Sequence, residues 1–145
     1  MEDLQKILKE NKYRKIKFKI TKTQHLLIKV TLNGVKGNFI LDTGASTCCI
    51  GFESIDYFNL TTSESKTKAA GAGGTGMETL VSRDNEIKIG RWEQKNFELV
   101  AFDLSHVNEA LLHHKVKAVH GIIGADVLQK GKAIIDYYNH CFYLK

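Results

Sequence analysis

The segment from residue 25 to residue 44 constrains the fold more than any other part of the chain. Two stretches rich in Leu, Ile and Val, 25–32 and 35–41, are separated by Asn33-Gly34. Asn-Gly is the strongest short signal for a β-hairpin, because both residues tolerate positive φ. The returning strand ends on Asp42-Thr43-Gly44, so the pattern places an acidic side chain where a core strand leaves the interior.

Short strands separated by turn signals recur through the rest of the chain. We expect further strands at 15–20, 47–52, 65–70, 77–81, 86–89, 96–102, 133–136 and 140–144, and helices at 3–11, 106–114 (with Ser105 as N-cap) and 125–129. About nine strands with turn signals every 8–12 residues are typical of a closed or nearly closed β-barrel. The sequence therefore predicts a mainly β fold with two or three short helices.

Composition narrows the class of protein. The 145 residues suit one domain, and 43% hydrophobic with 26% charged residues is ordinary for a globular chain. Three cysteines with no repeated spacing argue against a disulfide framework and favour reduced thiols. No apolar run approaches the ~20 residues that a membrane span needs, and the N-terminus lacks a signal-peptide core. We expect a cytoplasmic protein with no membrane partner.

The positive charge does not by itself indicate nucleic acid. The net charge is +5, and much of the excess lies between Lys6 and Lys36. The lysines of 15–20 alternate with apolar residues, as on the solvated face of a half-buried strand. Since no zinc-finger spacing or aromatic RNA-binding signature accompanies them, we expect no nucleic-acid partner.

Asp42 stands out chemically, because a carboxylate directly after an apolar strand is costly to desolvate. Thr43 adds a hydroxyl, and Gly44 removes a side chain where another backbone can approach. A carboxylate held rigidly at the edge of a core suits proton-transfer chemistry. The opposing interpretation is a structural aspartate in a tight turn.

Two motifs together resemble a known family. Leu41-Asp42-Thr43-Gly44-Ala45 is similar to the active-site signature of retropepsin-like aspartic proteases, and Ile122-Ile123-Gly124 is similar to the strand that crosses behind it. The motifs occur in the family's order about 80 residues apart, and the resemblance spans 26–144. It implies a single-lobe acid-protease barrel at 25–145 with an N-terminal extension at 1–24. The N-terminal extension and the extra helix make the chain closer to cellular and bacterial members than to the shorter retroviral ones.

The resemblance also implies roles for individual residues. Asp42 would be the catalytic aspartate, and the Thr43 hydroxyl would bond across a dimer axis. Gly44 would let the loop approach its mate, while Ala45 matches the dimeric type of enzyme. The flap over the substrate would include Gly71, Ala72, Gly73 and Gly74. The strand that supports the loop would be formed by Ile122, Ile123 and Gly124.

Assembly follows from the chemistry. Aspartic peptide hydrolysis needs two carboxylates that share a proton, and only one Asp-Thr-Gly occurs in the chain. The second must come from another copy across a two-fold axis. We therefore expect a homodimeric aspartic endopeptidase that cleaves peptide or protein substrates without metal or cofactor. The alternative is an inactive peptide-binding or dimerisation module on the same fold.

Several other features carry competing interpretations. Residues 71–76 match G-x-G-x-x-G, but a dinucleotide site needs an apolar strand before it and a helix after it, and neither is expected. His106 and His113 could share a helix face, although no ligand spacing completes a metal site. Asp126, in a helix's first turn, and Asp136, at a turn, are weak candidates for a second acid. Cys48 would need a nearby base to act as a nucleophile.

Overall fold

The structure is a computed structural model that describes residues 2–64, 69–71 and 74–145. Its helices are α1 (Glu2–Glu10), α2 (Ser105–His113), α3 (Ala125–Lys130) and the short 3-10 helix η1 (Phe52–Ser54). Its strands are β1 (Arg14–Lys17), β2 (Lys19–Ile20), β3 (Leu26–Leu32), β4 (Val35–Leu41), β5 (Cys49–Gly51), β6 (Thr62–Glu64), β7 (Ala69–Gly71), β8 (Gly74–Met77), β9 (Thr79–Ile89), β10 (Trp92–Phe102), β11 (Gly121–Ile123), β12 (Ile134–Asp136) and β13 (Cys141–Leu144).

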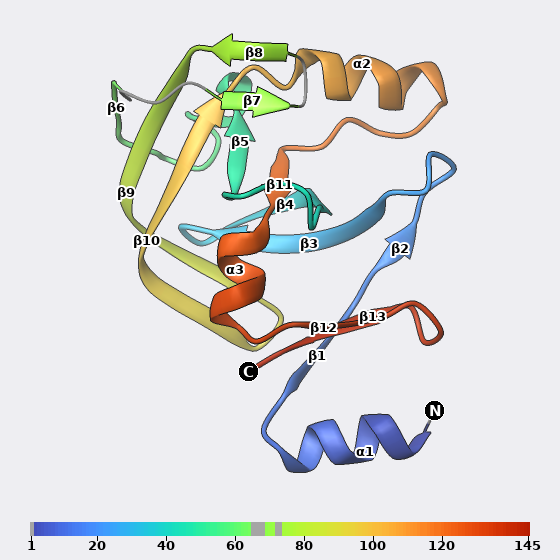
Figure 1. The fold of residues 1–145 in the computed structure, drawn as a ribbon. Helices are drawn as coiled ribbons and strands as arrows, with labels where there is room; N and C mark the ends of the chain where they lie inside the picture. Colours follow the sequence, from blue (N-terminus) through green and yellow to red (C-terminus); the bar gives the residue numbers. More distant parts are fainter. Residues whose placement is uncertain (1, 65–68, 72–73) are drawn as a thin grey trace.

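Six strands close into a barrel, as the sequence predicts. Neighbours pair in the order β3, β4, β11, β5, β10 and β9, and β9 pairs again with β3 (Figure 1). β11 is inserted between β4, to which it runs parallel, and β5, to which it runs antiparallel. This insertion brings the end of β11 beside the end of β4, where the sequence places Asp42.

The hairpin of β3 and β4 is confirmed. Leu26 lies opposite Leu41 and Leu32 opposite Val35, with Asn33 and Gly34 at φ 51° and 81° in the turn. Burial in β3 alternates along the strand, and its inward side chains join the main hydrophobic cluster with those of β4. Turn chemistry and period-two burial therefore act together to fix the register that ends at Asp42.

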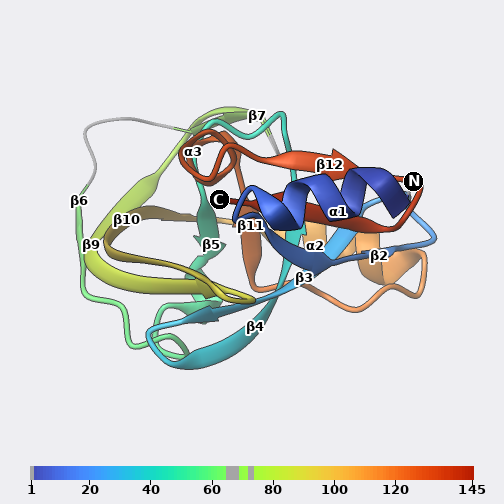
Figure 2. The ribbon, with the colours of Figure 1, turned by 90° about the horizontal axis from the view of Figure 1, so that it is seen from below.

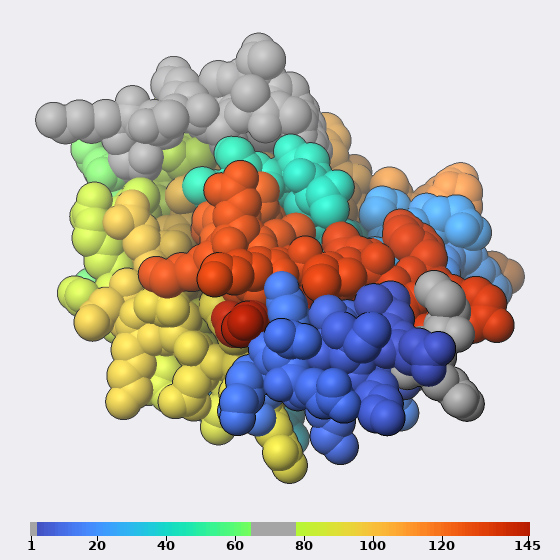
Figure 3. All heavy atoms as spheres, turned by 60° about the horizontal axis from the view of Figure 1, so that its bottom comes forward, coloured from blue at the N-terminus to red at the C-terminus, as the bar shows by residue number. Residues whose placement is uncertain are grey.

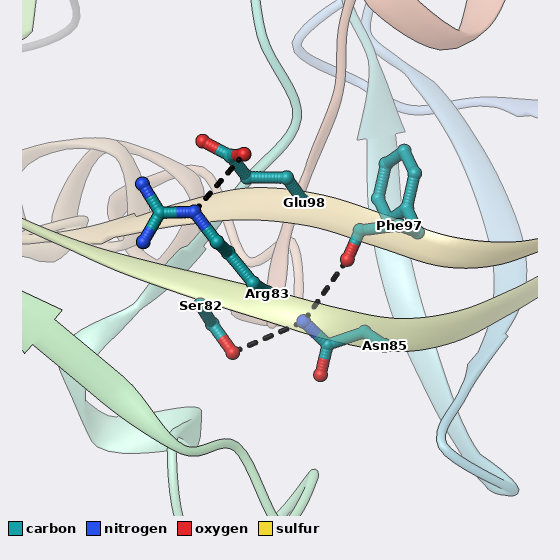
Figure 4. A network of polar contacts seen from close by, with 5 residues as sticks. All are labelled: Ser82, Arg83, Asn85, Phe97 and Glu98. Atoms are coloured by element: carbon teal, nitrogen blue, oxygen red, sulfur yellow. Dashed lines mark hydrogen bonds and ion pairs between the residues drawn. The ribbon is translucent and has the colours of Figure 1, made fainter.

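β9 and β10 are longer than predicted, at eleven residues each. The polar segment after Val81 continues as strand because its buried side chains find partners. The Nδ2 of Asn85 donates to the Ser82 hydroxyl at 3.0 Å and to the Phe97 carbonyl at 3.2 Å (Figure 4). These bonds offset the cost of burying an amide and coincide with an irregularity in the β9–β10 register.

A second, three-stranded sheet is built from both ends of the chain, in the order β1, β13, β12. Ile16 and Phe18 are buried in the main cluster and Ile20 packs against it, as the period-two pattern predicts. α1 lies across the other face of this sheet, where Leu8 packs with Cys141 and Tyr143 (Figure 2).

One helix boundary differs from the prediction. Ser105 is the first residue of α2, and the N-cap is Leu104, whose side chain makes no capping bond. Instead, the carboxylate of Asp103 accepts the Ser105 N–H at 2.8 Å. The acidic side chain two residues upstream supplies the acceptor, and this bond lowers the pKa of Asp103.

Two further expectations concern cysteines and membranes. All three cysteines are free and buried, as predicted. Within the described parts of the chain, none of the helices combines the length and apolar character required to cross a bilayer.

Candidate active site

Asp42 follows the last residue of β4, and its side chain is exposed. Its backbone N–H donates to the carbonyl of Ile123 at 2.9 Å, which ties the start of the loop to β11. Its Oδ1 accepts the N–H of Gly44 at 2.8 Å, and its carbonyl accepts the N–H of Ala45 at 3.2 Å. The loop is thus a tight turn that holds a solvent-facing carboxylate in one orientation.

β11 supports this loop from behind. Ile122 and Ile123 lie opposite Ile40 and Leu41 of β4, and both are buried. A Cβ on Gly124 would lie 2.7 Å from the carbonyl oxygen of Ala45, so only glycine fits there. The Ala125 N–H donates to the same oxygen at 2.7 Å. The residues that the family resemblance singled out on β11 therefore contact the segment that carries Asp42.

Sequence reasoning missed a second link, between Cys48 and Asp126. The Asp126 carboxylate accepts the Cys48 N–H at 3.0 and 3.1 Å and its thiol at 3.0 Å. The Cys48 sulfur in turn accepts the Gly124 N–H at 3.3 Å. The only signal in the sequence was an acidic residue in the first turn of α3, which a favourable helix dipole also explains.

The contact between Cys48 and Asp126 argues against two competing interpretations, Cys48 as a nucleophile and Asp126 as a second catalytic acid. Burial, and after it the charge and hydrogen bond of Asp126, raises the pKa of the Cys48 thiol well above its usual value. Burial likewise raises the pKa of Cys49 to about 12. A buried thiol that stays protonated is a poor nucleophile. Asp126 is occupied by the loop, so it serves as an anchor for Cys48 rather than as a second acid.

Asp136 also has a structural role. Its carboxylate accepts the backbone N–H of Asn139 at 3.0 Å and its side-chain Nδ2 at 2.7 Å. These bonds lower the pKa of Asp136 and hold the turn between β12 and β13. The prediction that Asp136 starts a turn is confirmed.

The glycine-rich segment forms a hairpin in the part that is described. β7 and β8 pair antiparallel, with Gly71 opposite Gly74. Ala72 and Gly73 of the predicted flap lie outside the described residues. The chain continues from β8 into β9 rather than into a helix, which excludes the dinucleotide-binding interpretation of the glycine motif.

Thr43 and Ala45 follow Asp42 in the same loop. Thr43 is exposed, and in the described structure its side chain makes no hydrogen bond. Ala45 is half-buried against a cluster that includes Ile40 and Ile122. Among the described residues, no group of three or more His, Cys, Asp or Glu side chains is arranged to hold a metal ion.

A sequence model of the aspartyl protease family matches residues 28–127. The chain belongs to the aspartyl protease family. The match begins in β3 and ends in α3, so it includes the Asp42 loop, the β7–β8 hairpin and β11. No curated protein sequence is significantly similar to this chain.

Solved structures show the same fold. A retropepsin-like aspartic protease from Rickettsia conorii is 20% identical, with a TM-score of 0.62 over 91% of this chain and 90% of that chain. The EIAV protease in an inhibitor complex is 21% identical, with a TM-score of 0.59 over 81% and 98%. The retroviral protease-like domain of Ddi1 from Leishmania major is 15% identical, with a TM-score of 0.57 over 83% and 88%. The predicted retropepsin-like lobe is confirmed, and the bacterial protein matches more of this chain than the viral one does.

Proposed function

We propose that this protein is an aspartic endopeptidase that acts as a homodimer, with one Asp42 from each chain forming the catalytic pair. The observation that carries the proposal is the Asp42 carboxylate itself. It is exposed at the end of a buried strand and oriented by the Gly44 N–H, on a loop that β11 holds in place. A nucleophilic water needs a carboxylate in this state, accessible but fixed.

The mechanism requires two such carboxylates close together. When two carboxyl groups are about 3 Å apart, they cannot both be ionised, so the pair holds one proton. The ionised Asp42 takes a proton from water, which attacks the peptide carbonyl, while the protonated Asp42 polarises the carbonyl oxygen. The proton taken from water then passes to the amide nitrogen as the C–N bond breaks, which releases the amine and the carboxylic acid. In this proposal, the Thr43 hydroxyls bond across the axis. The β7–β8 hairpin covers an extended substrate, which it aligns by backbone hydrogen bonds.

Two features of the chain support a homodimer. Each chain offers a single Asp-Thr-Gly, so a lone copy lacks the second carboxylate. In addition, β12 is an edge of the terminal sheet, without a strand partner on its outer side among the described residues. An edge strand is a template for pairing with another chain, and a two-fold axis would place β12 against its own copy.

Three free, buried cysteines favour a reducing compartment such as the cytoplasm.

The test is to replace Asp42 by Asn and to measure cleavage of an unfolded polypeptide between about pH 2 and 8, because a carboxyl pair that must share one proton is inactive at both extremes of pH. We expect Asp42→Asn to abolish cleavage and to leave the fold and the sedimentation behaviour unchanged. Asp84→Asn is the matched control, because Asp84 is exposed on β9 and has φ 61°, which asparagine tolerates.

The proposal fails if Asp42→Asn retains full activity, or if the active species is a strict monomer. A wild-type dimer that retains an extended peptide but cleaves nothing at any of these pH values would instead identify a peptide-binding module on the same fold.

A further inference from the structure

A basic hollow lies at the end of the molecule away from the β7–β8 hairpin. Its volume is about 630 Å³, and it is bounded by the end of α1, the start of β1 and the turn between β9 and β10. In Figure 1 the β7–β8 hairpin is at the top and α1 at the bottom, and in Figure 3 the N-terminal residues lie beside the β9–β10 tip. The hollow is thus separate from the candidate active site.

The hollow is lined by five cationic side chains, which are Lys9, Lys12, Arg14, Lys15 and Arg91. No Asp or Glu is among the described residues that line it. All five side chains are exposed, and none makes an ion pair in the described part of the chain. Within the described residues no side-chain carboxylate pairs with these cations, so they are available to a ligand.

The positive charge of the chain is concentrated in residues 1–36, which supply four of the five cations of the hollow. Residues 1–36 contain ten Lys or Arg and three Asp or Glu, a net charge of +7, whereas residues 37–145 carry −2. The alternation along 15–20 explains a solvated strand face. It does not explain Arg91, which the turn between β9 and β10 brings beside the N-terminal cations.

The positions of these cations are set by the backbone. Lys12 has φ 71°, and the next N–H, that of Tyr13, donates to the Leu8 carbonyl at 3.0 Å, so the chain turns sharply from α1 into β1. The Tyr13 hydroxyl donates to the Lys132 carbonyl at 3.0 Å. Gly90, at φ 59°, turns β9 into β10 and presents Arg91. The positions of these mutually repelling cations are therefore fixed by three elements, which are α1, β1 and the β9–β10 turn.

Tyr143 also lines the hollow and is 2% exposed. Its hydroxyl has the Cys141 thiol beside it and no other partner among the described residues.

We propose that this hollow is a binding site for a compact polyphosphate group. The volume lies within the range of about 300–1,000 Å³ that is usual for small-ligand sites. Several cations that converge on one hollow match a ligand that carries several negative charges in a small volume. The guanidinium groups of Arg14 and Arg91 can each bind two phosphate oxygens, and the lysines add point charges.

The test is calorimetric titration of the full chain with inorganic tripolyphosphate. We expect saturable binding at one site per chain that weakens as salt concentration rises. The double variant Arg14→Gln/Arg91→Gln should weaken binding by at least about tenfold, because two bidentate contacts are lost. The matched control is Lys22→Gln/Lys36→Gln, which removes the same charge from exposed positions outside the hollow and should change affinity less than about twofold.

Equal weakening by both double variants would show only a diffuse charge effect and would overturn the proposal, as would the absence of saturable binding. A titration with citrate distinguishes a phosphate site from a carboxylate site. If citrate binds as tightly as tripolyphosphate does, the assignment to phosphate is overturned. A nucleoside triphosphate and a single-stranded oligonucleotide distinguish a small ligand from a polymer. Affinity that grows with oligonucleotide length would reassign the surface to nucleic acid. Cleavage is not part of the readout, so the result is independent of the proposed peptidase activity.

Discussion

At the scale of single residues, the loop that carries Asp42 is held by side chains that lie outside the Asp-Thr-Gly motif. Asp126 joins the helix after β11 to the segment after Asp42, through the N–H and the thiol of Cys48. The two residues are 78 positions apart. Their hydrogen bonds, rather than the signature motif alone, link β11 and α3 to the candidate active-site loop.

Replacing Asp126 should therefore loosen this loop. In Asp126→Ala the buried Cys48 N–H loses its acceptor, and we expect the free energy of unfolding to fall by about 1–3 kcal/mol. Chemical denaturation measures this loss. Asp56→Ala removes an exposed carboxylate with no hydrogen bond in the described structure, and should change stability by less than about 0.5 kcal/mol. Equal effects of the two variants would contradict the anchoring role.

A second prediction at this scale concerns His120, which stacks on Tyr57 with ring centroids 4.8 Å apart. Its Nδ1 accepts the Asn38 N–H at 3.0 Å, so the folded chain favours the neutral ring. Burial lowers the pKa of His120 below its usual 6.5. As pH falls, the unfolded chain therefore takes up the proton before the folded chain does. The contribution of His120 to stability should be fully present above about pH 6.5 and should decline as pH falls below it.

Denaturation at a series of pH values checks this slope. In His120→Gln the decline in stability between about pH 6.5 and 5 should be shallower than in the wild type, whereas the exposed His113→Gln should keep the wild-type slope. A slope that is identical in wild type and His120→Gln would assign the pH dependence to other groups.

At the scale of elements, local signals predicted local structure well. The Asn33-Gly34 turn, the strand that ends at Asp42 and the helix after β11 could all be recognised, because each depends on residues close in sequence. The pairing of β1 with β13 could not, since it joins Arg14 to Leu144. Nor could the full length of β9, because the amide of Asn85 is accommodated by distant partners, Phe97 on β10 and Asn33 in the β3–β4 turn, as well as by Ser82 on β9. The same limit applies to the Cys48–Asp126 contact and to the basic hollow.

Close packing of β11 against the loop predicts a strict requirement for glycine. In Gly124→Ala the new Cβ would lie 2.7–2.9 Å from backbone atoms of Ala45 and Thr47, which cannot move without shifting the loop. We expect a loss of about 1–3 kcal/mol in stability, the usual cost of overpacking. Thermal denaturation of the variant and of Gly51→Ala measures it.

Gly51→Ala is a suitable control because its Cβ would be 3.5 Å from Leu104, an ordinary contact, at φ −72°. It should keep or slightly raise stability, since alanine restricts the unfolded chain. Wild-type stability in Gly124→Ala would show that the loop is not packed against β11 as the structure describes.

At the scale of the whole molecule, the two proposed functions belong to separate regions of the structure. The basic hollow is complete within one chain, whereas the proposed active site is half of a pair. Binding of tripolyphosphate should therefore be independent of assembly, and cleavage should depend on it. The two carboxylates must come from two chains, so an inactive partner should inactivate a wild-type chain in the same dimer.

Subunit mixing tests this dependence directly. A fixed amount of wild type is exchanged with a fivefold excess of Asp42→Asn chain under conditions in which dimers dissociate and reassociate. With random pairing, only about one-sixth of the wild-type activity should remain, because most wild-type chains are then paired with a chain that lacks the carboxylate. An equal excess of Asp84→Asn chain should not lower the activity. Activity that is unaffected by Asp42→Asn, despite demonstrated exchange of labelled subunits, would mean that a single chain hydrolyses peptides alone.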